Sequence, residues 1–215
     1  MTTITTVIFD FGGVFTSSPV EEFAKFEAKQ GLPNKFLGGV IKTNHHSNAW
    51  AKFERSEIDQ TEFNRAFAQE TKIAGHEVSG DTLLSLLSLT LKPAMIAALA
   101  QVKAAGFKTG CITNNLPNLD SGAMLKASAD THHAAEVFAQ FDHVIESSKV
   151  GIRKPEPEIY LKMCDALHST PEQCVFLDDL GINLKPAKAL GMATIKVPFG
   201  DVKPAIDELF KLLEL

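Results

Sequence analysis

The sequence has no excess of basic residues. Its 21 Lys and Arg residues are outnumbered by 26 Asp and Glu residues, which gives a net charge of -5 at pH 7. Proteins that bind nucleic acids usually carry a basic face, because contacts with the phosphate backbone supply much of their affinity. The charge balance therefore argues against a nucleic-acid partner.

Long apolar runs are also missing. No stretch approaches the roughly 18 consecutive apolar residues that a membrane-spanning helix requires. No Lys or Arg precedes the first apolar run, and Asp10 interrupts that run, which is unlike a secretory signal. The 3 cysteines are odd in number and lack the spacing of metal ligands. We therefore expect reduced thiols in a cytoplasmic protein that makes no membrane contact.

What the sequence does contain is a series of short apolar segments with the composition of β-strands. The five segments are Thr6–Phe9, Phe107–Ile112, His143–Ile145, Cys174–Leu177 and Ala193–Val197. Amphipathic stretches lie between most of them, and we expect helices at Pro93–Ala105, at Pro155–Leu167 and across residues 202–213. Strands that alternate with helices predict an α/β fold, in which helices cover both faces of a parallel sheet.

Residues 17–91 have a different pattern, rich in phenylalanine and helical periodicity but poor in strand signals. Within them, Asp59 and Glu62 resemble a capping box at the start of a helix that carries Phe63 and Phe67. We expect this interval to be an all-helical insertion between the first and second strands.

Polar residues directly follow three of the predicted strands, and Lys154 lies in the segment after a fourth, just before a predicted helix. In an open parallel sheet, ligands bind at the carboxyl ends of the strands, so these residues are the candidates for a functional site. Taken one at a time, each has a structural interpretation as a turn residue, a helix cap or a solvated lysine. Their joint occurrence at successive strand ends favours a functional site. The candidates are Asp10, Thr113 and Asn114, Lys154, and the pair Asp178 and Asp179.

This set of side chains suits phosphoryl transfer. Asp10 and Asp179 offer the oxygen ligands that Mg²⁺ prefers. Lys154 and the Thr113 hydroxyl could neutralise and orient phosphoryl oxygens, while the Asp10 carboxylate attacks phosphorus and forms an aspartyl-phosphate. Asn183 is predicted to cap a helix over residues 184–190 and so to fix the acidic loop.

The same residues stand in motifs that resemble those of the haloacid dehalogenase superfamily of hydrolases, most of which are Mg²⁺-dependent phosphatases. The segments "FDFGGVF", "ITNN", "KPEPEIY" and "VFLDD" are similar to its four motifs, in order. The span "VFLDDLGINLKPAKALGM" is especially similar to the N-terminal phosphatase domains of soluble epoxide hydrolases. The motif "DFGGV" with "ITNN" also resembles the related N-terminal domain of an acyl-CoA dehydrogenase family member.

The resemblance implies a Rossmann-like core at residues 1–16 and 92–215, with residues 17–91 as a helical cap. It implies that Asp10 is both nucleophile and metal ligand, and that Asp178 and Asp179 belong to the Mg²⁺ site. It further implies phosphate binding by Thr113, Asn114 and Lys154.

Gly12 departs from the family pattern, in which a second aspartate protonates the leaving group and then activates water. The backbone carbonyl of residue 12 can still contact the metal. A general acid typically contributes about 10²–10⁴-fold in rate, so this departure matters for function. Substitutes for the missing acid could come from the cap or from elsewhere in the chain. The candidates are His45, His46, Glu54, Glu57 and Asp120.

Three functions remain open at this point. We favour a Mg²⁺-dependent phosphatase that hydrolyses a small phosphorylated metabolite, either with a good leaving group or with an acid borrowed from the cap. A non-catalytic module that binds a phosphorylated ligand or a protein partner is the main alternative. A 2-haloacid dehalogenase is the third, because halide leaves without a proton, although Asp178 and Asp179 favour a metal site. Substrate selectivity is expected to lie in the cap, around residues 45–50.

Overall fold

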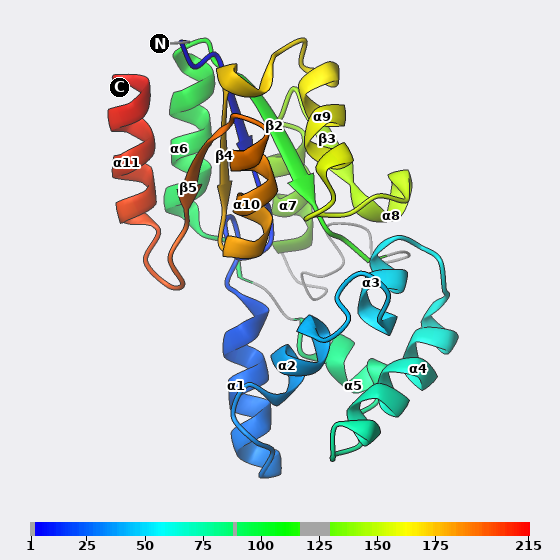
Figure 1. Cartoon of the computed structure of the whole chain (residues 1–215). Helices are drawn as coiled ribbons and strands as arrows, with labels where there is room; N and C mark the ends of the chain where they lie inside the picture. The colour runs from blue at the N-terminus through cyan, green and yellow to red at the C-terminus, as the bar shows by residue number, and fades with distance from the viewer. Residues whose placement is uncertain (1–2, 88–89, 117–129) are drawn as a thin grey trace.

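A five-stranded parallel sheet forms the centre of the molecule (Figure 1). The computed structural model describes residues 3–87, 90–116 and 130–215. The sheet order is β3-β2-β1-β4-β5, and every neighbouring pair runs parallel. The strands are β1 (Thr6–Phe9), β2 (Lys108–Thr113), β3 (His143–Glu146), β4 (Cys174–Asp178) and β5 (Ala193–Lys196). The α/β prediction is confirmed, and the strand boundaries differ from the expected ones by a single residue at most.

Helices cover both faces of the sheet, as expected. The period of two along β1 sends Val7 and Phe9 to one face and Ile8 to the other. The first face packs against α6 (Pro93–Ala104), α7 (Asp130–Phe138) and α11 (Lys203–Leu213). The second packs against α9 (Pro157–Ala166) and α10 (Gly181–Ala189). Because both faces are buried, the strands read as continuous apolar runs instead of alternating ones.

The described chain between β1 and α6 consists of helices joined by loops. Its helices are α1 (Pro19–Gln30), α2 (Phe36–Lys42), α3 (Ala49–Glu54), α4 (Gln60–Ile73) and α5 (Gly80–Ser85). They enclose a separate apolar core that contains Phe53, Phe63 and Phe67. As expected, Asp59 caps α4, because its side chain accepts a hydrogen bond from the backbone N–H of Glu62 at 2.8 Å. The whole insertion lies below the carboxyl ends of the strands, on the side away from both termini (Figure 1).

Two connections join this insertion to the sheet, and they lie side by side. Thr16 and Leu91 form an antiparallel bridge. Next to it, the backbone N–H of Ser17 donates to the Thr90 carbonyl at 2.8 Å. We keep residues 17–91 as the proposed cap and residues 1–16 with 92–215 as the proposed core.

Two predicted helix starts are wrong. Helix α9 begins at Pro157 and not at Pro155, because a residue that precedes proline is driven out of the helical region, and Glu156 accordingly has φ -65° and ψ 127°. Helix α10 begins at Gly181 and not at Leu184. Asn183 therefore lies inside the helix and does not cap it.

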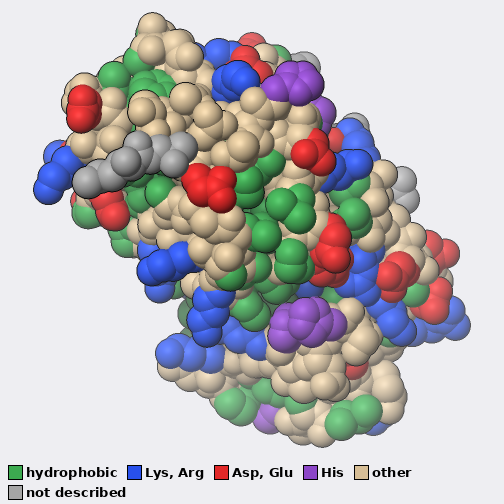
Figure 2. Space-filling model, turned by 45° about the horizontal axis from the view of Figure 1, so that its top comes forward, with side chains coloured by type: hydrophobic (Ala, Val, Ile, Leu, Met, Phe, Trp, Pro, Cys, Tyr) green, Lys and Arg blue, Asp and Glu red, His purple; other side chains and the backbone are tan. Residues whose placement is uncertain are grey.

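Among the described residues, none of the helices is both long and apolar enough to span a membrane. Acidic and basic side chains are both scattered over the face in Figure 2, as the mixed composition predicts.

Candidate active site

Asp10 stands at the carboxyl end of the central strand, between the two strands that flank it. Its backbone N–H extends the ladder of β1 by donating to the Leu177 carbonyl at 2.8 Å. Its carboxylate Oδ1 accepts a hydrogen bond from the backbone N–H of Phe11 and lies 2.6 Å from the Lys154 ammonium. The side chain is buried, with a residue exposure of only 6%. Asp10 is thus fixed at the switch point of the sheet, where ligands bind in this architecture.

Lys154 joins two of the candidate carboxylates. Its Nζ lies 2.6 Å from Asp10 Oδ1 and 2.9 Å from Asp178 Oδ2, and the side chain is 1% exposed. Burial opposes the positive charge, but the Asp10 and Asp178 carboxylates outweigh burial and raise the pKa of the Lys154 ammonium. The lysine therefore stays protonated and supplies a fixed positive charge beside Asp10.

The site holds more negative than positive charge around this lysine. Carboxylate oxygens of Asp10, Asp178 and Asp179 all lie within 4.8 Å of one another. Burial, together with Asp178 and Asp179, raises the pKa of Asp10 well above its usual value, against the opposing effect of Lys154. Burial and Asp178 raise the pKa of Asp179 to about 7. Three carboxylates around one ammonium fit a divalent cation, which would offset the two remaining negative charges.

Asp178 is held by hydrogen bonds on both of its oxygens. The Asn183 side-chain amide donates to Oδ1 at 3.1 Å and to Oδ2 at 3.0 Å. The backbone N–H of Leu180 donates to Oδ1 at 2.7 Å. The predicted role of Asn183 was that of a helix cap, and its actual role is to orient the carboxylate that binds Lys154. Of the adjacent aspartates, Asp179 thus keeps more capacity for a further ligand.

Asn114 and Thr113 follow β2, next to the site. The Asn114 side chain binds the backbone of Lys154 twice: its amide donates to the Lys154 carbonyl at 2.9 Å, and its oxygen accepts from the Lys154 N–H at 2.9 Å. This pairing fixes the chain that carries the lysine. The Asn114 side chain therefore positions Lys154, and a phosphate contact by residue 114 would fall to its backbone. Thr113 is buried at 6% exposure at the end of the strand.

Of the two glycines that follow Asp10, only Gly13 is required by the structure. Gly13 has φ +79°, and a Cβ atom there would lie 2.2 Å from Asp179 Oδ2. A side chain at position 13 would therefore collide with the acidic cluster. Gly12 has no such positive φ, and among the described residues a Cβ atom built on it meets no atom within 4 Å beyond its two chain neighbours. Its lack of a side chain is not required by the backbone or by packing in this structure.

Lys92 is a site neighbour that sequence reasoning missed. It precedes α6, and its Nζ donates to the Gly13 carbonyl at 2.7 Å. Its positive charge also favours the ionised form of Asp179 and so lowers the pKa of that carboxyl against the effect of burial. Lys92 and Gly13 are 79 residues apart, so no local pattern joins them.

The candidate substitutes for the missing acid are mostly committed to other partners. The Glu54 carboxylate binds Arg153 at 2.5 Å, and Glu57 binds Arg55 at 2.6 Å. His45 and His46 lie in the loop between α2 and α3 with ring centroids 3.9 Å apart. Asp120 lies outside the described residues.

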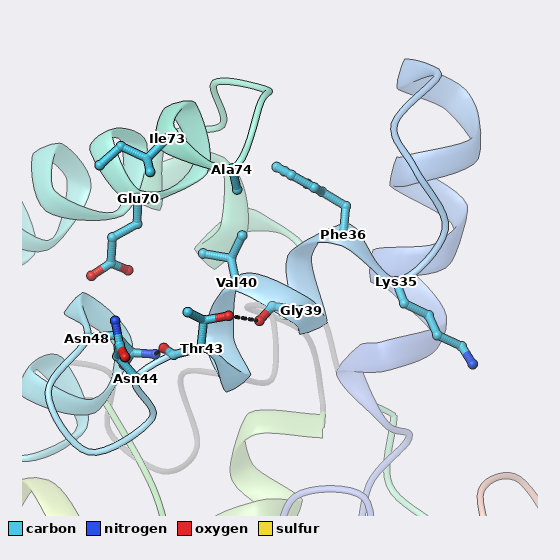
Figure 3. A pocket seen from close by; sticks show the side chains of 10 residues that line it. All are labelled: Lys35, Phe36, Gly39, Val40, Thr43, Asn44, Asn48, Glu70, Ile73 and Ala74. Carbon is cyan, nitrogen blue, oxygen red and sulfur yellow. Dashed lines mark hydrogen bonds between the residues drawn. The ribbon is translucent and has the colours of Figure 1, made fainter.

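A cavity of about 490 Å³ lies in the helical insertion, between α2 and α4 (Figure 3). Phe36, Val40 and Ile73 give it apolar walls, and the Glu70 carboxylate points into it, whereas the ammonium of Lys35 points away. None of the residues predicted for the active site lines this cavity. The acidic cluster, and not this cavity, is therefore the candidate site for chemistry.

The structure is an α/β fold whose parallel sheet presents a buried aspartate cluster and a lysine at its switch point, which makes a carboxylate the candidate nucleophile. The chain belongs to the haloacid dehalogenase-like hydrolases, because the model of that family matches residues 4–191. The family resemblance noted in the sequence is thereby confirmed.

Three curated relatives illustrate the range of the family. Acyl-CoA dehydrogenase family member 10 of Mus musculus is 35% identical over 96% of this chain, which spans 19% of that protein. Bifunctional epoxide hydrolase 2 of Sus scrofa is 34% identical over 95% of this chain, which spans 38% of that protein. A sesquiterpene phosphatase of Aspergillus oryzae is 26% identical over 89% of this chain and 88% of its own length.

Solved structures share the fold. A predicted HAD-like family hydrolase from Porphyromonas gingivalis has a TM-score of 0.65 and 21% identity, covering 97% of this chain and 98% of its own. A HAD family enzyme from Bacteroides thetaiotaomicron, in complex with magnesium and inorganic phosphate, has a TM-score of 0.61 and 19% identity, covering 92% of this chain and 96% of its own.

Proposed function

We propose that this protein is a Mg²⁺-dependent phosphatase that hydrolyses a small phosphorylated metabolite through an aspartyl-phosphate on Asp10. The observation that carries the proposal is the cluster of three buried carboxylates within 4.8 Å, with the Lys154 ammonium 2.6 Å from Asp10. Relatives that include a sesquiterpene phosphatase support the reaction class, and a solved structure of the same fold contains magnesium and phosphate.

Asp10 acts as the nucleophile in this proposal. A carboxylate oxygen attacks phosphorus, the bond from phosphorus to the ester oxygen breaks, and the leaving group departs as an oxyanion that solvent protonates. Water then attacks the aspartyl-phosphate, which releases inorganic phosphate and restores the carboxylate. Dividing the reaction into two displacements lowers the barrier of each.

Lys154 carries the positive charge that this attack requires. An anionic nucleophile and an anionic phosphate ester repel each other, and a fixed ammonium 2.6 Å from Asp10 offsets that repulsion. Asp178 and Asn114 hold the lysine by its ammonium and by its backbone, so little reorganisation is needed during the reaction. Their proposed role is to keep Lys154 in place.

The residues present fit a magnesium ion. Asp10, Asp179 and the Gly12 carbonyl are the proposed ligands, with Asp178 supporting the surrounding shell. When bound, Mg²⁺ supplies positive charge that stabilises the charge developing on the phosphoryl group. Its binding also removes the mutual repulsion of the buried carboxylates.

The proton for the leaving group does not come from residue 12, because glycine has no side chain to donate it. We therefore propose that the natural substrate has a leaving group that departs without a proton from this position. Aryl, enol and acyl phosphates have leaving groups of this kind, because their oxyanions are stable.

A panel of phosphorylated metabolites, assayed for phosphate release with and without Mg²⁺, tests the proposal. We expect Mg²⁺-dependent release that is lost in Asp10→Asn, together with no halide release from 2-haloacids. Halide release that persists after chelation of the metal would indicate a dehalogenase. Binding of phosphate and Mg²⁺ without turnover on any ester would indicate a non-catalytic module.

A further inference from the structure

A buried ion pair joins the helical insertion to the segment that carries Lys154. Glu54 is the last residue of α3, and Arg153 directly precedes Lys154. The Arg153 Nε donates to Glu54 Oε2 at 2.6 Å, and its Nη2 lies 2.5 Å from the same oxygen. The two residues are only 4% and 8% exposed, although they are 99 positions apart in the chain.

Further hydrogen bonds surround this pair and cross the same boundary. The Arg153 Nη1 donates to the His45 carbonyl at 2.8 Å, which fixes the loop before α3. The Ser147 hydroxyl donates to the Glu54 carbonyl at 2.8 Å. The same hydroxyl accepts from the backbone N–H of Asn115 at 3.1 Å. Helix α3 is thus bound directly to the segment after β3, and Ser147 links it further to Asn115, which follows β2.

The pair is sensitive to the loss of either member. Burial raises the pKa of Glu54, while Arg153 and the Trp50 side chain favour its charged form. Removal of the arginine leaves a carboxylate without its counter-charge in a buried position, which is strongly unfavourable. Well-packed hydrophobic residues can often replace a buried ion pair at little cost in stability, so stability alone does not explain why the two charges are present. A role in fixing the local geometry explains the charges of Glu54 and Arg153 better than a role in stability.

The geometry that the pair fixes is that of Lys154. Arg153 is covalently next to Lys154, whose backbone is held from the other side by Asn114. Asn115, which follows Asn114, is hydrogen-bonded to Ser147, the residue that also binds the Glu54 carbonyl. The position of α3 is therefore linked to the lysine through two neighbouring segments of backbone.

We propose that Glu54 and Arg153 form a positioning joint, through which the helical insertion sets the placement of Lys154 against Asp10. The expected effect on turnover rests on the proposed function, whereas the structural linkage between the two segments does not. Neither residue is assigned contact with the substrate. The joint affects kcat, because it aligns the Lys154 ammonium, whose positive charge offsets the negative charge of the Asp10 carboxylate.

Four variants test the joint. Glu54→Gln and Arg153→Gln each break the pair, and E54Q/R153Q removes both charges at once. Ser56→Ala is the matched control, because Ser56 makes an exposed hydrogen bond across the same boundary, to the Ser148 carbonyl at 2.7 Å. Thermal melting comes first, and all rates are measured well below the lowest midpoint.

The kinetic readout is hydrolysis of a small aryl phosphate with saturating Mg²⁺. We expect kcat to fall about tenfold or more in both single variants and equally in the double variant, since residues that act as a unit are not additive. KM stays within about twofold, and Ser56→Ala matches the wild type. Wild-type kcat in folded E54Q/R153Q would overturn the proposal.

Hydrogen exchange provides a readout that needs no catalysis. We expect Glu54→Gln to accelerate exchange in residues 49–54 and, at the same time, in residues 147–154, with the sheet unchanged. Acceleration confined to α3 would overturn the linkage. If exchange responds in both segments while the wild type hydrolyses no phosphate ester, the joint stands and the proposed phosphatase function fails.

Discussion

Replacing Gly12 with aspartate restores the side chain that phosphatases of the family carry at this position. The backbone at Gly12 has no positive φ, and a Cβ atom there has no neighbour within 4 Å in the described part of the chain apart from the adjoining residues. The substitution therefore adds a carboxylate without a clash or backbone strain. Because glycine loses more conformational freedom on folding than other residues, the change should alter the free energy of unfolding by no more than about 1 kcal/mol.

The rate effect depends on the leaving group. A positioned general acid contributes about 10²–10⁴-fold, and we expect the lower end, because no neighbouring residue has been selected to orient the new side chain. For simple alkyl phosphates, kcat/KM should thus rise about 100-fold, which corresponds to about 2.7 kcal/mol of transition-state stabilisation. Aryl phosphates should gain less than about tenfold, since a phenolate departs without a proton.

Two variants separate the chemistry from the structure. Gly12→Asn introduces a side chain of the same size as aspartate but without an acidic proton, so it should give no gain in rate on alkyl phosphates. Gly13→Ala places a Cβ atom 2.2 Å from Asp179 Oδ2 at φ +79°, so it should abolish both Mg²⁺ binding and turnover. If Gly12→Asp folds, binds Mg²⁺ in titration calorimetry and still gains nothing on alkyl phosphates, the missing acid does not limit this enzyme.

Other perturbations address the nucleophile, the metal and the support of Lys154. Asp10→Asn should reduce phosphate release to background and remove the phosphorylated Asp10 peptide from acid-quenched mass spectrometry; turnover near that of the wild type would exclude Asp10 as nucleophile. Mg²⁺ at a hundredfold excess over its Kd should add about 2.7 kcal/mol to stability, or roughly 5–10 °C in the melting temperature, and Asp179→Asn should lose most of this shift. An equal shift in both proteins would place the ion elsewhere. Asn183→Ala removes two donors from the buried Asp178 and should lower the free energy of unfolding by roughly 2–3 kcal/mol in urea titrations. A loss below about 0.5 kcal/mol would show that Asp178 does not depend on Asn183.

The sheet could be predicted from sequence because each strand is a short apolar run that ends in a polar residue. In a parallel sheet buried on both faces, this pattern is strong and local. The carboxyl ends of such strands meet at one edge, which is why the sequence alone groups Asp10, Lys154 and Asp178. Predicting the residues of the acidic cluster needed only the alternation of strands and helices that defines an α/β fold.

The supporting contacts could not be predicted in the same way, because they join distant parts of the chain. Asn183 has the local appearance of a helix cap, and only the approach of Asp178 shows that its amide is used by a carboxylate. Asn114 resembles a phosphate-binding residue, but its side chain is paired with the backbone of Lys154, 40 positions away. In both cases the residue type indicated hydrogen bonding, and tertiary structure chose the partner.

The two glycines show how one pattern can combine a structural requirement with a functional difference. In the sequence, nothing distinguishes Gly12 from Gly13, which follow each other shortly after Asp10. In the structure, Gly13 must be glycine because Asp179 occupies the space of its side chain, whereas Gly12 faces open space. Packing among the described residues does not explain the missing side chain at Gly12. Under the proposed function, a leaving group that needs no proton from this position explains it, and the Gly12→Asp variant tests that explanation.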